Sequence, residues 1–247
     1  MKEPINIQLS DRLEGVGEYY FSRKLREIDQ MRAAGRRIIS LGIGSPDRPP
    51  HASVVDRLHE VASRPDTHAY QSYKGAAVLR RAFAKWYSDR YGVQLDPESE
   101  ILPLIGSKEG LMHICMTYLR KGDRGLIPNP GYPTYRSAVT LSGGEPKEYR
   151  LTAEGDWFPN LEQIESEGLE GVKMMILNYP QMPTGAVPTR EMFARVVEFA
   201  HRHSILLVHD NPYSFVRNTE PLSLLSVEGA KECAIELNSL SKSHNMA

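Results

Sequence analysis

The chain has 247 residues, of which 40% are hydrophobic and 25% are charged, and its formal net charge is −1 at pH 7. It is long enough to bury a large core, as one large domain or two small ones. Because the charges nearly balance, the chain has no overall positive potential that would attract nucleic acid or anionic lipid. No apolar run approaches the roughly 18 residues of a membrane-spanning helix. We therefore expect neither a nucleic-acid nor a membrane partner.

The N-terminal residues Met1 to Pro4 lack the apolar core of a signal peptide. Cys115 and Cys233 lie in apolar stretches, which favours reduced core cysteines over a disulfide. Both observations predict a cytoplasmic protein.

Two amphipathic helices are expected in the first third of the chain. Phe21, Leu25, Ile28 and Met31 recur at helical spacing after an N-terminal arm, and this helix stops at Ala34-Gly35. A turn-rich stretch follows over residues 42–47. The second helix is expected from about residue 76 to residue 90, with Leu79, Phe83 and Trp86 on one side.

From residue 101 onward, short apolar runs alternate with helical segments. The runs expected as strands are Ile101 to Ile105, Gly125 to Pro128, Val172 to Leu177, Ile205 to Val208 and Ala234 to Leu237. Helical periodicity lies between them at Leu111 to Leu119 and Met192 to Ala200. This alternation predicts an α/β fold with a mostly parallel sheet covered by helices on both faces.

Ligands of such sheets bind at the carboxyl ends of the strands, so the residues after each strand matter most. Gly106-Ser107-Lys108 opens a helix and offers free backbone N–H groups to an anion. The other two strand ends carry His209-Asp210 through Tyr213, and Ser239 through Lys242, a lysine flanked by hydroxyls. Taken singly, each loop also has an ordinary explanation, as a turn, a helix cap or a surface lysine.

Three histidines resemble a metal site by number alone. His201 and His203 end a helix, whereas His209 lies on the following strand, and no carboxylate or cysteine completes a known ligand spacing. We interpret them as structural histidines and expect no metal.

The motifs in this order resemble the fold-type-I aminotransferases (class I/II), which depend on pyridoxal 5'-phosphate. The resemblance runs from about Tyr19 to the last residue. Its strongest parts are Tyr70 to Gly75, Pro130 to Tyr135, Asn178 through Pro183-Thr184-Gly185, Asp210 to Tyr213, and Ser239 to Lys242. It implies the large domain of this fold, with a homodimer that shares its active sites.

The resemblance also implies roles for individual residues. Lys242 would hold the cofactor as a Schiff base and then carry the substrate's proton. Asp210 would pair with the pyridine nitrogen, Tyr213 would donate to the phenolic oxygen, and Tyr132 would stack on the ring.

Further contacts follow from the same resemblance. The backbone amides of Ser107 and Lys108 and the hydroxyls of Ser239 and Ser241 would hold the cofactor phosphate. Tyr70 would reach the phosphate of the neighbouring subunit. Gly44 and Tyr19 would lie near the substrate.

Two departures from the family pattern stand out. The family usually carries Asn immediately before Pro-Thr-Gly, as a donor to the cofactor's phenolic oxygen, but here that residue is Met182. Gln181 could compensate from one position away. The second departure is that the sequence stops five residues after Lys242. We expect a fragment that lacks the last sheet strand and the C-terminal small domain, with 1–45 as an arm and part of the small domain and 46–247 as an incomplete cofactor-binding large domain.

The function implied is transamination between an amino acid and a 2-oxo acid, an activity of amino-acid metabolism, with low or no activity in a fragment. A carbon–sulfur lyase and a non-catalytic, cofactor-binding protein are the alternatives. The stretches Glu18 to Phe21 and Leu41 to Gly44 look similar to the diaminopimelate and the broad aspartate/aromatic branches, which leaves the donor amino acid open.

Overall fold

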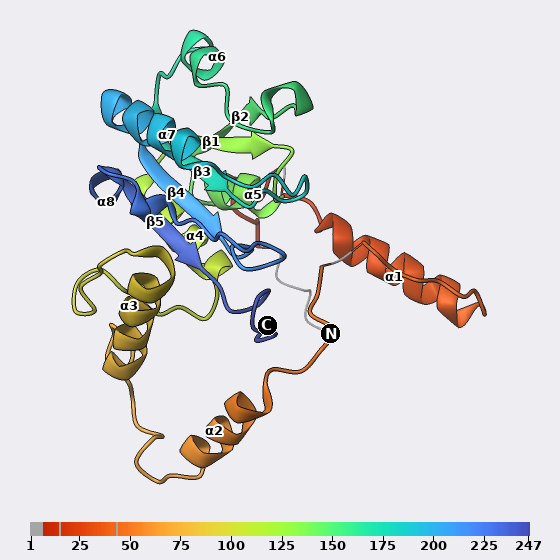
Figure 1. Ribbon diagram of the computed structural model, residues 1–247. Coiled ribbons are helices and arrows are strands. Elements are labelled where there is room, and N and C mark those ends of the chain that lie inside the picture. The colour runs from red at the N-terminus through yellow and green to blue at the C-terminus, as the bar shows by residue number, and fades with distance from the viewer. Residues whose placement is uncertain (1–6, 15, 43) are drawn as a thin grey trace.

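A five-stranded sheet, parallel throughout, organises the protein (Figure 1). The computed structural model describes residues 7–14, 16–42 and 44–247. The strand order is β2-β1-β3-β4-β5. The strands are β1 (Arg124–Asn129), β2 (Glu145–Arg150), β3 (Val172–Asn178), β4 (Leu206–Asn211) and β5 (Ala234–Asn238). The predicted α/β class with a parallel sheet is confirmed.

Helices cover both faces of the sheet, α7 on one face and α4 and α5 on the other (Figure 1). The helices are α1 (Tyr20–Ala33), α2 (Ala52–Ala62), α3 (Ala77–Tyr91), α4 (Ser107–Tyr118), α5 (Thr134–Leu141), α6 (Leu161–Ser166), α7 (Arg190–His203) and α8 (Ala230–Cys233). None of these helices is both long and apolar enough to cross a membrane.

The core consists of two layers, because neighbouring residues of a strand point to opposite faces. On β4, Leu207 packs into the α7 layer with Phe193, whereas Val208 packs into the α4–α5 layer with Leu111. Both faces are buried, so the central strands are continuous apolar runs rather than alternating ones. That is why these strands could be recognised in the sequence.

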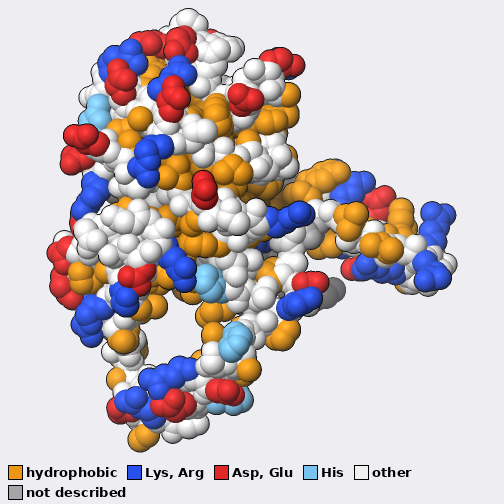
Figure 2. Space-filling view, viewed as in Figure 1, with side chains coloured by type: hydrophobic (Ala, Val, Ile, Leu, Met, Phe, Trp, Pro, Cys, Tyr) orange, Lys and Arg blue, Asp and Glu red, His pale blue; other side chains and the backbone are white. Residues whose placement is uncertain are grey.

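The N-terminal part lies outside this core. Neither α1 nor α2 contains a buried residue, and both stand away from the body of the protein (Figures 1 and 2). The accessible surface is 16421 Å², against about 11,000 Å² for a compact monomer of this mass. The expected division at residues 45 and 46 stays a prediction.

The strand expected at 101–105 is wrong. This segment is extended but pairs with no strand of the described chain, and Leu102 and Ile105 are 61% and 97% exposed. An apolar run becomes a strand only where a neighbouring backbone completes its hydrogen bonds. The sequence did not predict β2, an edge strand on which Tyr149 is the one buried residue. Helices α2, α5, α6 and α8 were not predicted either.

The two terminal histidines of α7 and the cysteines have separate environments. His201 Nε2 lies 2.7 Å from the Gly229 carbonyl, and His203 Nε2 lies 3.0 Å from a Glu165 carboxylate oxygen. Cys115 is buried and Cys233 is half-buried, and both are free thiols. Each of these side chains therefore packs locally.

Helix α7 begins at a side-chain cap that can be tested. Thr189 Oγ1 accepts a hydrogen bond from the Met192 N–H at 3.0 Å, and Thr189 itself is exposed. We expect Thr189→Ala to lower the free energy of unfolding by about 1 kcal/mol, the usual value of an N-cap. Urea denaturation measures this change, and Thr189→Ser, which keeps the hydroxyl, should stay close to wild type. Equal losses in both variants would contradict the cap.

Candidate active site

A large hollow lies at the carboxyl ends of β3, β4 and β5 and has a volume of about 810 Å³, a size typical of small-molecule sites. Its wall contains ten of the eleven residues singled out in the sequence: Tyr19, Gly44, Ser107, Lys108, Tyr132, Asp210, Tyr213, Ser239, Ser241 and Lys242. The eleventh, Tyr70, is fully exposed and lies outside the pocket wall. The fold thus brings together segments that are more than 200 residues apart.

Asp210 is a buried carboxylate near the end of β4. Its Oδ2 accepts a hydrogen bond from the Tyr135 hydroxyl at 2.8 Å, while Oδ1 is buried and has no partner among the described residues. The Asn178 side-chain amide donates to the Asp210 backbone carbonyl at 2.8 Å. Burial raises the pKa of Asp210, against the opposing effects of Tyr135 and His209. The free oxygen is suited to a cationic or N–H donor in the pocket.

A lysine and two tyrosines stand together in the pocket wall. Lys108 Nζ lies 5.6 Å from the ring centroids of both Tyr19 and Tyr132. Burial and the neighbouring Tyr132 raise the pKa of Tyr19 to about 12. Burial opposes ionisation of Tyr132 as well, but contacts with Thr134, Lys108 and Tyr19 outweigh it and lower the Tyr132 pKa. This part of the wall is cationic and aromatic.

Tyr213 contributes a phenol on the same side as Asp210. Burial raises its pKa, and the nearby Asp210 and Tyr132 raise it further. Its hydroxyl therefore keeps its proton at neutral pH and can donate a hydrogen bond.

The N-terminus of α4 opens toward the hollow without a side-chain cap. Gly106 occupies the N-cap position and offers no side chain, so the first amides of the helix remain available to an anion. Ser107, Lys108, Ser239 and Ser241 all line this part of the pocket. Ser239 Oγ accepts a hydrogen bond from the Ser241 N–H at 3.2 Å, which shapes the loop after β5.

Lys242 reaches across the pocket to the N-terminal segment. Its Nζ donates a hydrogen bond to the Gly44 carbonyl at 2.6 Å. The two residues lie 198 positions apart in the sequence. This contact ties the segment before α2 to the loop after β5.

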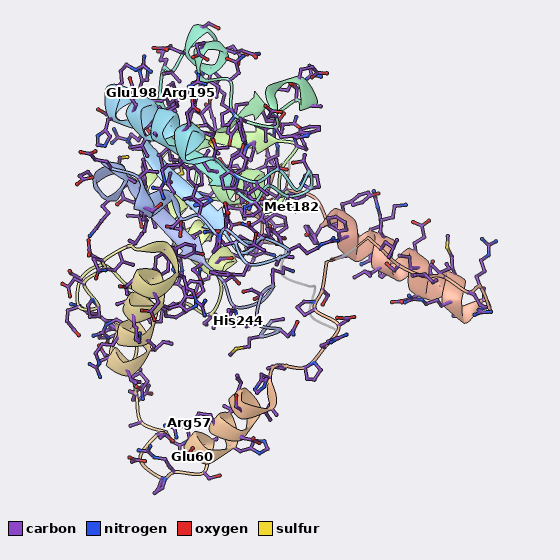
Figure 3. The ribbon with its side chains drawn as sticks, in the orientation of Figure 1. Arg57, Glu60, Met182, Arg195, Glu198 and His244 are labelled. Carbon is purple, nitrogen blue, oxygen red and sulfur yellow. The ribbon has the colours of Figure 1, made fainter. Side chains whose placement is uncertain are left out.

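Gln181, which was considered as a replacement for the family's asparagine, stabilises its own loop instead. Its amide nitrogen donates to the Pro130 carbonyl at 2.9 Å, and its Oε1 accepts hydrogen bonds from the N–H and hydroxyl of Thr184. Both ends of the amide therefore hold the loop together, so the expected compensation for the family's asparagine is not seen. Met182 lines the pocket in that position (Figure 3).

Two functional candidates were missed in the sequence. Tyr135 binds the Asp210 carboxylate, and Asn178 binds the Asp210 backbone and accepts a hydrogen bond from the Met182 N–H at 2.9 Å. Both stood inside the motifs noted above. Asn178 could have been identified, because it directly follows a predicted strand, whereas the Tyr135 contact spans 75 residues and leaves no local signal.

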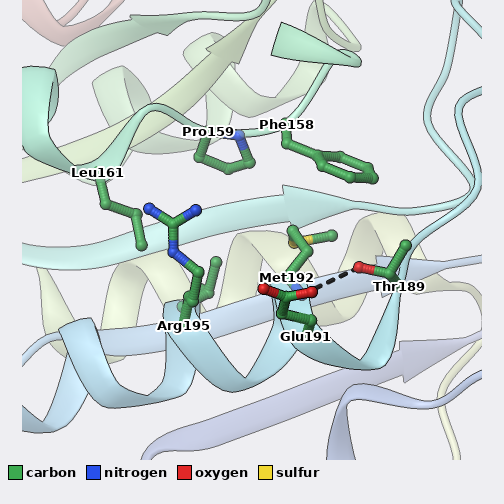
Figure 4. Close-up of a pocket in the computed structure, with 8 residues that line it drawn as sticks. Phe158, Pro159, Leu161, Thr189, Glu191, Met192 and Arg195 are labelled. Atoms are coloured by element: carbon green, nitrogen blue, oxygen red, sulfur yellow. Dashed lines mark hydrogen bonds between the residues drawn. The ribbon is translucent and has the colours of Figure 1, made fainter.

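A second, smaller hollow of about 190 Å³ lies beside α7 (Figure 4). Its wall is largely apolar, with Phe158, Leu161 and Met192, and Arg195 at its side forms an ion pair with Glu162 at 2.7 Å. The groups suited to chemistry lie in the large pocket instead.

Comparison with known proteins agrees with this geometry. The family described as aminotransferase class I and II matches residues 36–247. The LL-diaminopimelate aminotransferase of Moorella thermoacetica is 42% identical over 242 residues, covering 97% of this chain and 62% of that protein. That of Halothermothrix orenii is 38% identical over 239 residues, covering 96% and 61%. A substrate-bound structure of BacF from Bacillus subtilis has a TM-score of 0.91 at 38% identity, covering 98% and 62%.

The chain belongs to the class I and II aminotransferase family. It spans about three fifths of the length of these relatives, 61% and 62% in the two enzymes named. The family uses pyridoxal 5'-phosphate, and the residues present in this aminotransferase chain fit that cofactor. Asp210 has a buried oxygen without a partner, and the N-terminus of α4 is uncapped next to two serine hydroxyls. A basic ring nitrogen and a phosphate are the groups that such a donor set accepts.

The raised pKa of Asp210 predicts a stability cost in the cofactor-free aminotransferase chain. Folding raises this pKa above the unfolded value of about 3.9, so stability is lost as the pH rises through the folded pKa. We expect Asp210→Asn, which cannot ionise, to be more stable than wild type at neutral pH, with the difference shrinking toward acid pH.

Urea denaturation at several pH values measures this effect. Asp56→Asn, at an exposed position of α2, serves as the control and should leave the stability unchanged. A neutral-pH destabilisation in Asp210→Asn would contradict the argument, because it would mean that the ionised carboxylate stabilises the fold.

Proposed function

We propose that the protein to which this chain belongs transfers an amino group between an amino acid and a 2-oxo acid with the help of pyridoxal 5'-phosphate. The main support is that Lys242 lines the same pocket as the unpartnered Oδ1 of Asp210 and the uncapped N-terminus of α4. An amine, a carboxylate and an anion site are the three groups that this cofactor requires of a protein. Family membership points in the same direction.

Asp210 and Lys242 carry the chemical part of the proposal. The bound cofactor supplies a sink for the electron pair that is left when the substrate loses its α-proton. Asp210 keeps the ring nitrogen protonated through its free oxygen. Lys242 takes the proton at Nζ and returns it at a different position. For this its amine has to leave the Gly44 carbonyl, to which it donates at 2.6 Å.

The remaining residues of the wall bind and orient. The first amides of α4 at Ser107 and Lys108, with the hydroxyls of Ser239 and Ser241, would hold the phosphate. Tyr132 would bind the ring, and the protonated Tyr213 would donate to the phenolic oxygen. Met182 cannot add a second donor there. A hydrogen bond to a charged group contributes about 1.5–3 kcal/mol, so the chain depends more heavily on Tyr213.

We further propose a substrate with a carboxylate at its far end, of which LL-diaminopimelate is the leading candidate. The named relatives from Moorella and Halothermothrix are LL-diaminopimelate aminotransferases. Lys108 Nζ lies between Tyr19 and Tyr132 in the pocket wall and is suited to a second carboxylate. Tyr19 and Gly44 line the same region, where the α-carboxylate would bind.

Cofactor binding is the first test. The purified chain mixed with pyridoxal phosphate should develop the yellow absorption band of a lysine-bound cofactor. Lys242→Ala should lose this band, since it removes the amine assigned to the cofactor. Lys85→Ala serves as a matched control, because Lys85 is exposed on α3 and pairs with Asp89. A band that survives in Lys242→Ala would contradict the assignment of the lysine.

Activity then separates the three functional classes. Exchange of amino and keto groups between LL-diaminopimelate and 2-oxoglutarate supports the aminotransferase. Release of pyruvate and ammonia from a sulfur amino acid would indicate the lyase instead. A band with neither reaction would favour the non-catalytic binder.

We also propose a homodimer in which Tyr70 contacts the phosphate site of the partner. In support, Tyr70 is fully exposed and remote from the pocket of its own chain, and Ile39, Leu41, Tyr73 and Met116 are exposed as well. Sedimentation should give twice the chain mass. Tyr70→Phe should keep the dimer but weaken cofactor binding by roughly 10- to 150-fold, the value of one hydrogen bond to a charged group. A monomer that binds the cofactor as tightly as a dimer would rule this out.

A further inference from the structure

A buried pair of a histidine and a glutamate lies directly behind the carboxylate of Asp210. His209 and Glu236 face each other across β4 and β5, and both side chains are 0% exposed. His209 Nδ1 lies 2.8 Å from Glu236 Oε2. His209 packs against Phe193 of α7, whereas Asp210 points to the opposite face and binds Tyr135 of α5. The pair is therefore outside the pocket, on the reverse side of the strand.

Glu236 receives three further hydrogen bonds from two other places in the chain. Its Oε1 accepts hydrogen bonds from the hydroxyls of Tyr87 and Ser223, each at 2.9 Å, and its Oε2 accepts one from the Leu224 N–H at 2.9 Å. Burial opposes ionisation, but His209 and these hydroxyls outweigh it and lower the pKa of Glu236. Hydrogen bonds donated to a carboxyl group favour its charged form. Glu236 is thus an ionised, buried acceptor.

Both ring nitrogens of His209 face acceptors. Nε2 lies 3.0 Å from the Tyr179 carbonyl, which can only accept, so this nitrogen carries a proton. Nδ1 faces a carboxylate that already receives three other hydrogen bonds, so this nitrogen carries a proton as well. With both protons present, His209 is a positively charged imidazolium.

We propose that Glu236 and Tyr179 hold His209 as an imidazolium, and that this charge keeps the adjacent Asp210 ionised. His209 is then a positioning residue for the cofactor's ring nitrogen, an inference that rests on the proposed function. Among the residues that the structure describes, Tyr135 is the one side-chain donor to Asp210, which would otherwise tend to take up a proton. Glu236 lies one strand further away, at a spacing of about 4.8 Å, so the positive member of the pair is the nearer one. Little water screens charges at such a depth.

The other titratable groups around His209 are neutral phenols. Tyr87 on α3 donates to Glu236, and Tyr179 follows β3 and supplies its carbonyl to His209. Burial raises the pKa of both tyrosines well above the ordinary value. Their charge does not change near neutral pH, so Glu236 and Asp210 are the groups that decide the charge balance at His209.

The charge states are measured first in the cofactor-free chain by NMR. The ¹⁵N shifts of His209 should report two protonated ring nitrogens at neutral pH, as its two acceptors require. The ¹³C shift of the Asp210 carboxyl follows its titration. In Glu236→Gln we expect a neutral His209 ring at neutral pH, with Asp210 titrating roughly one pH unit higher, which is a tenfold change. His209→Gln should raise the Asp210 titration in the same way.

Tyr87→Phe is the matched control. It removes a hydrogen bond from the same Glu236 oxygen that Ser223 binds, but it keeps the imidazolium. The Asp210 titration should stay at its wild-type position even if the variant is less stable. A neutral His209 ring in the wild-type chain would overturn the inference without the need for any variant. An Asp210 titration that is equal in all variants would overturn it too.

Cofactor binding provides the second measurement. Pyridoxal phosphate should bind about tenfold more weakly to Glu236→Gln and His209→Gln at neutral pH, and the difference should shrink at higher pH, where Asp210 ionises unaided. Equal affinities across the pH range would contradict a role toward the cofactor. If the wild-type chain binds no cofactor while the NMR results are as expected, the proposed function fails and the charge assignment stands.

Discussion

The register between β3, β4 and β5 determines where every group in the pocket lies. Asn178 pairs with Asp210, and Asp210 pairs with Leu237, so three parallel strands end side by side. The loops that follow them carry Met182, Tyr213 and Lys242 to the same hollow. In a parallel sheet, a shift of one residue would turn each side chain to the opposite face. Asp210 would then exchange places with His209, and the pocket would lose its carboxylate.

This register is maintained by apolar packing on both faces rather than by the polar groups of the site. Residues such as Leu207 and Val208 are completely buried in opposite layers, and each layer permits one orientation of the strand. The core therefore fixes the positions of the polar groups at the strand ends. These groups do not have to stabilise the fold themselves and are free to serve chemistry. Asp210, a buried carboxylate with a free oxygen, is tolerated because the layers beneath it are well packed.

Much of the fold and of the pocket could be predicted from the sequence, because both depend on local patterns. The buried strands β1, β3, β4 and β5 are apolar runs, and the ten pocket residues lie in motifs that resemble those of a known family. The edge strand β2 escaped prediction because its exposed positions are polar. The apolar run at 101–105 was wrongly predicted as a strand, because a strand needs a neighbouring strand to pair with. A local sequence pattern does not show whether such a neighbour exists. Tyr135 and the pair of His209 and Glu236 depend on contacts across 75 and 27 residues. His209 was interpreted as a structural histidine in the sequence, but its partner could not be identified.

The hydrogen bond from Lys242 to the Gly44 carbonyl links two processes that otherwise look independent. While the amine is held there, it helps to fasten the N-terminal arm over the pocket, and an arm without buried side chains has few other attachments. A ligand that binds the Lys242 amine removes this hydrogen bond from the arm. By thermodynamic reciprocity, an interaction that stabilises the arm in its present position lowers the affinity for that ligand. The factor is the same as that by which the ligand weakens the interaction. Ligand binding in the pocket and ordering of the arm are thus coupled, and each opposes the other.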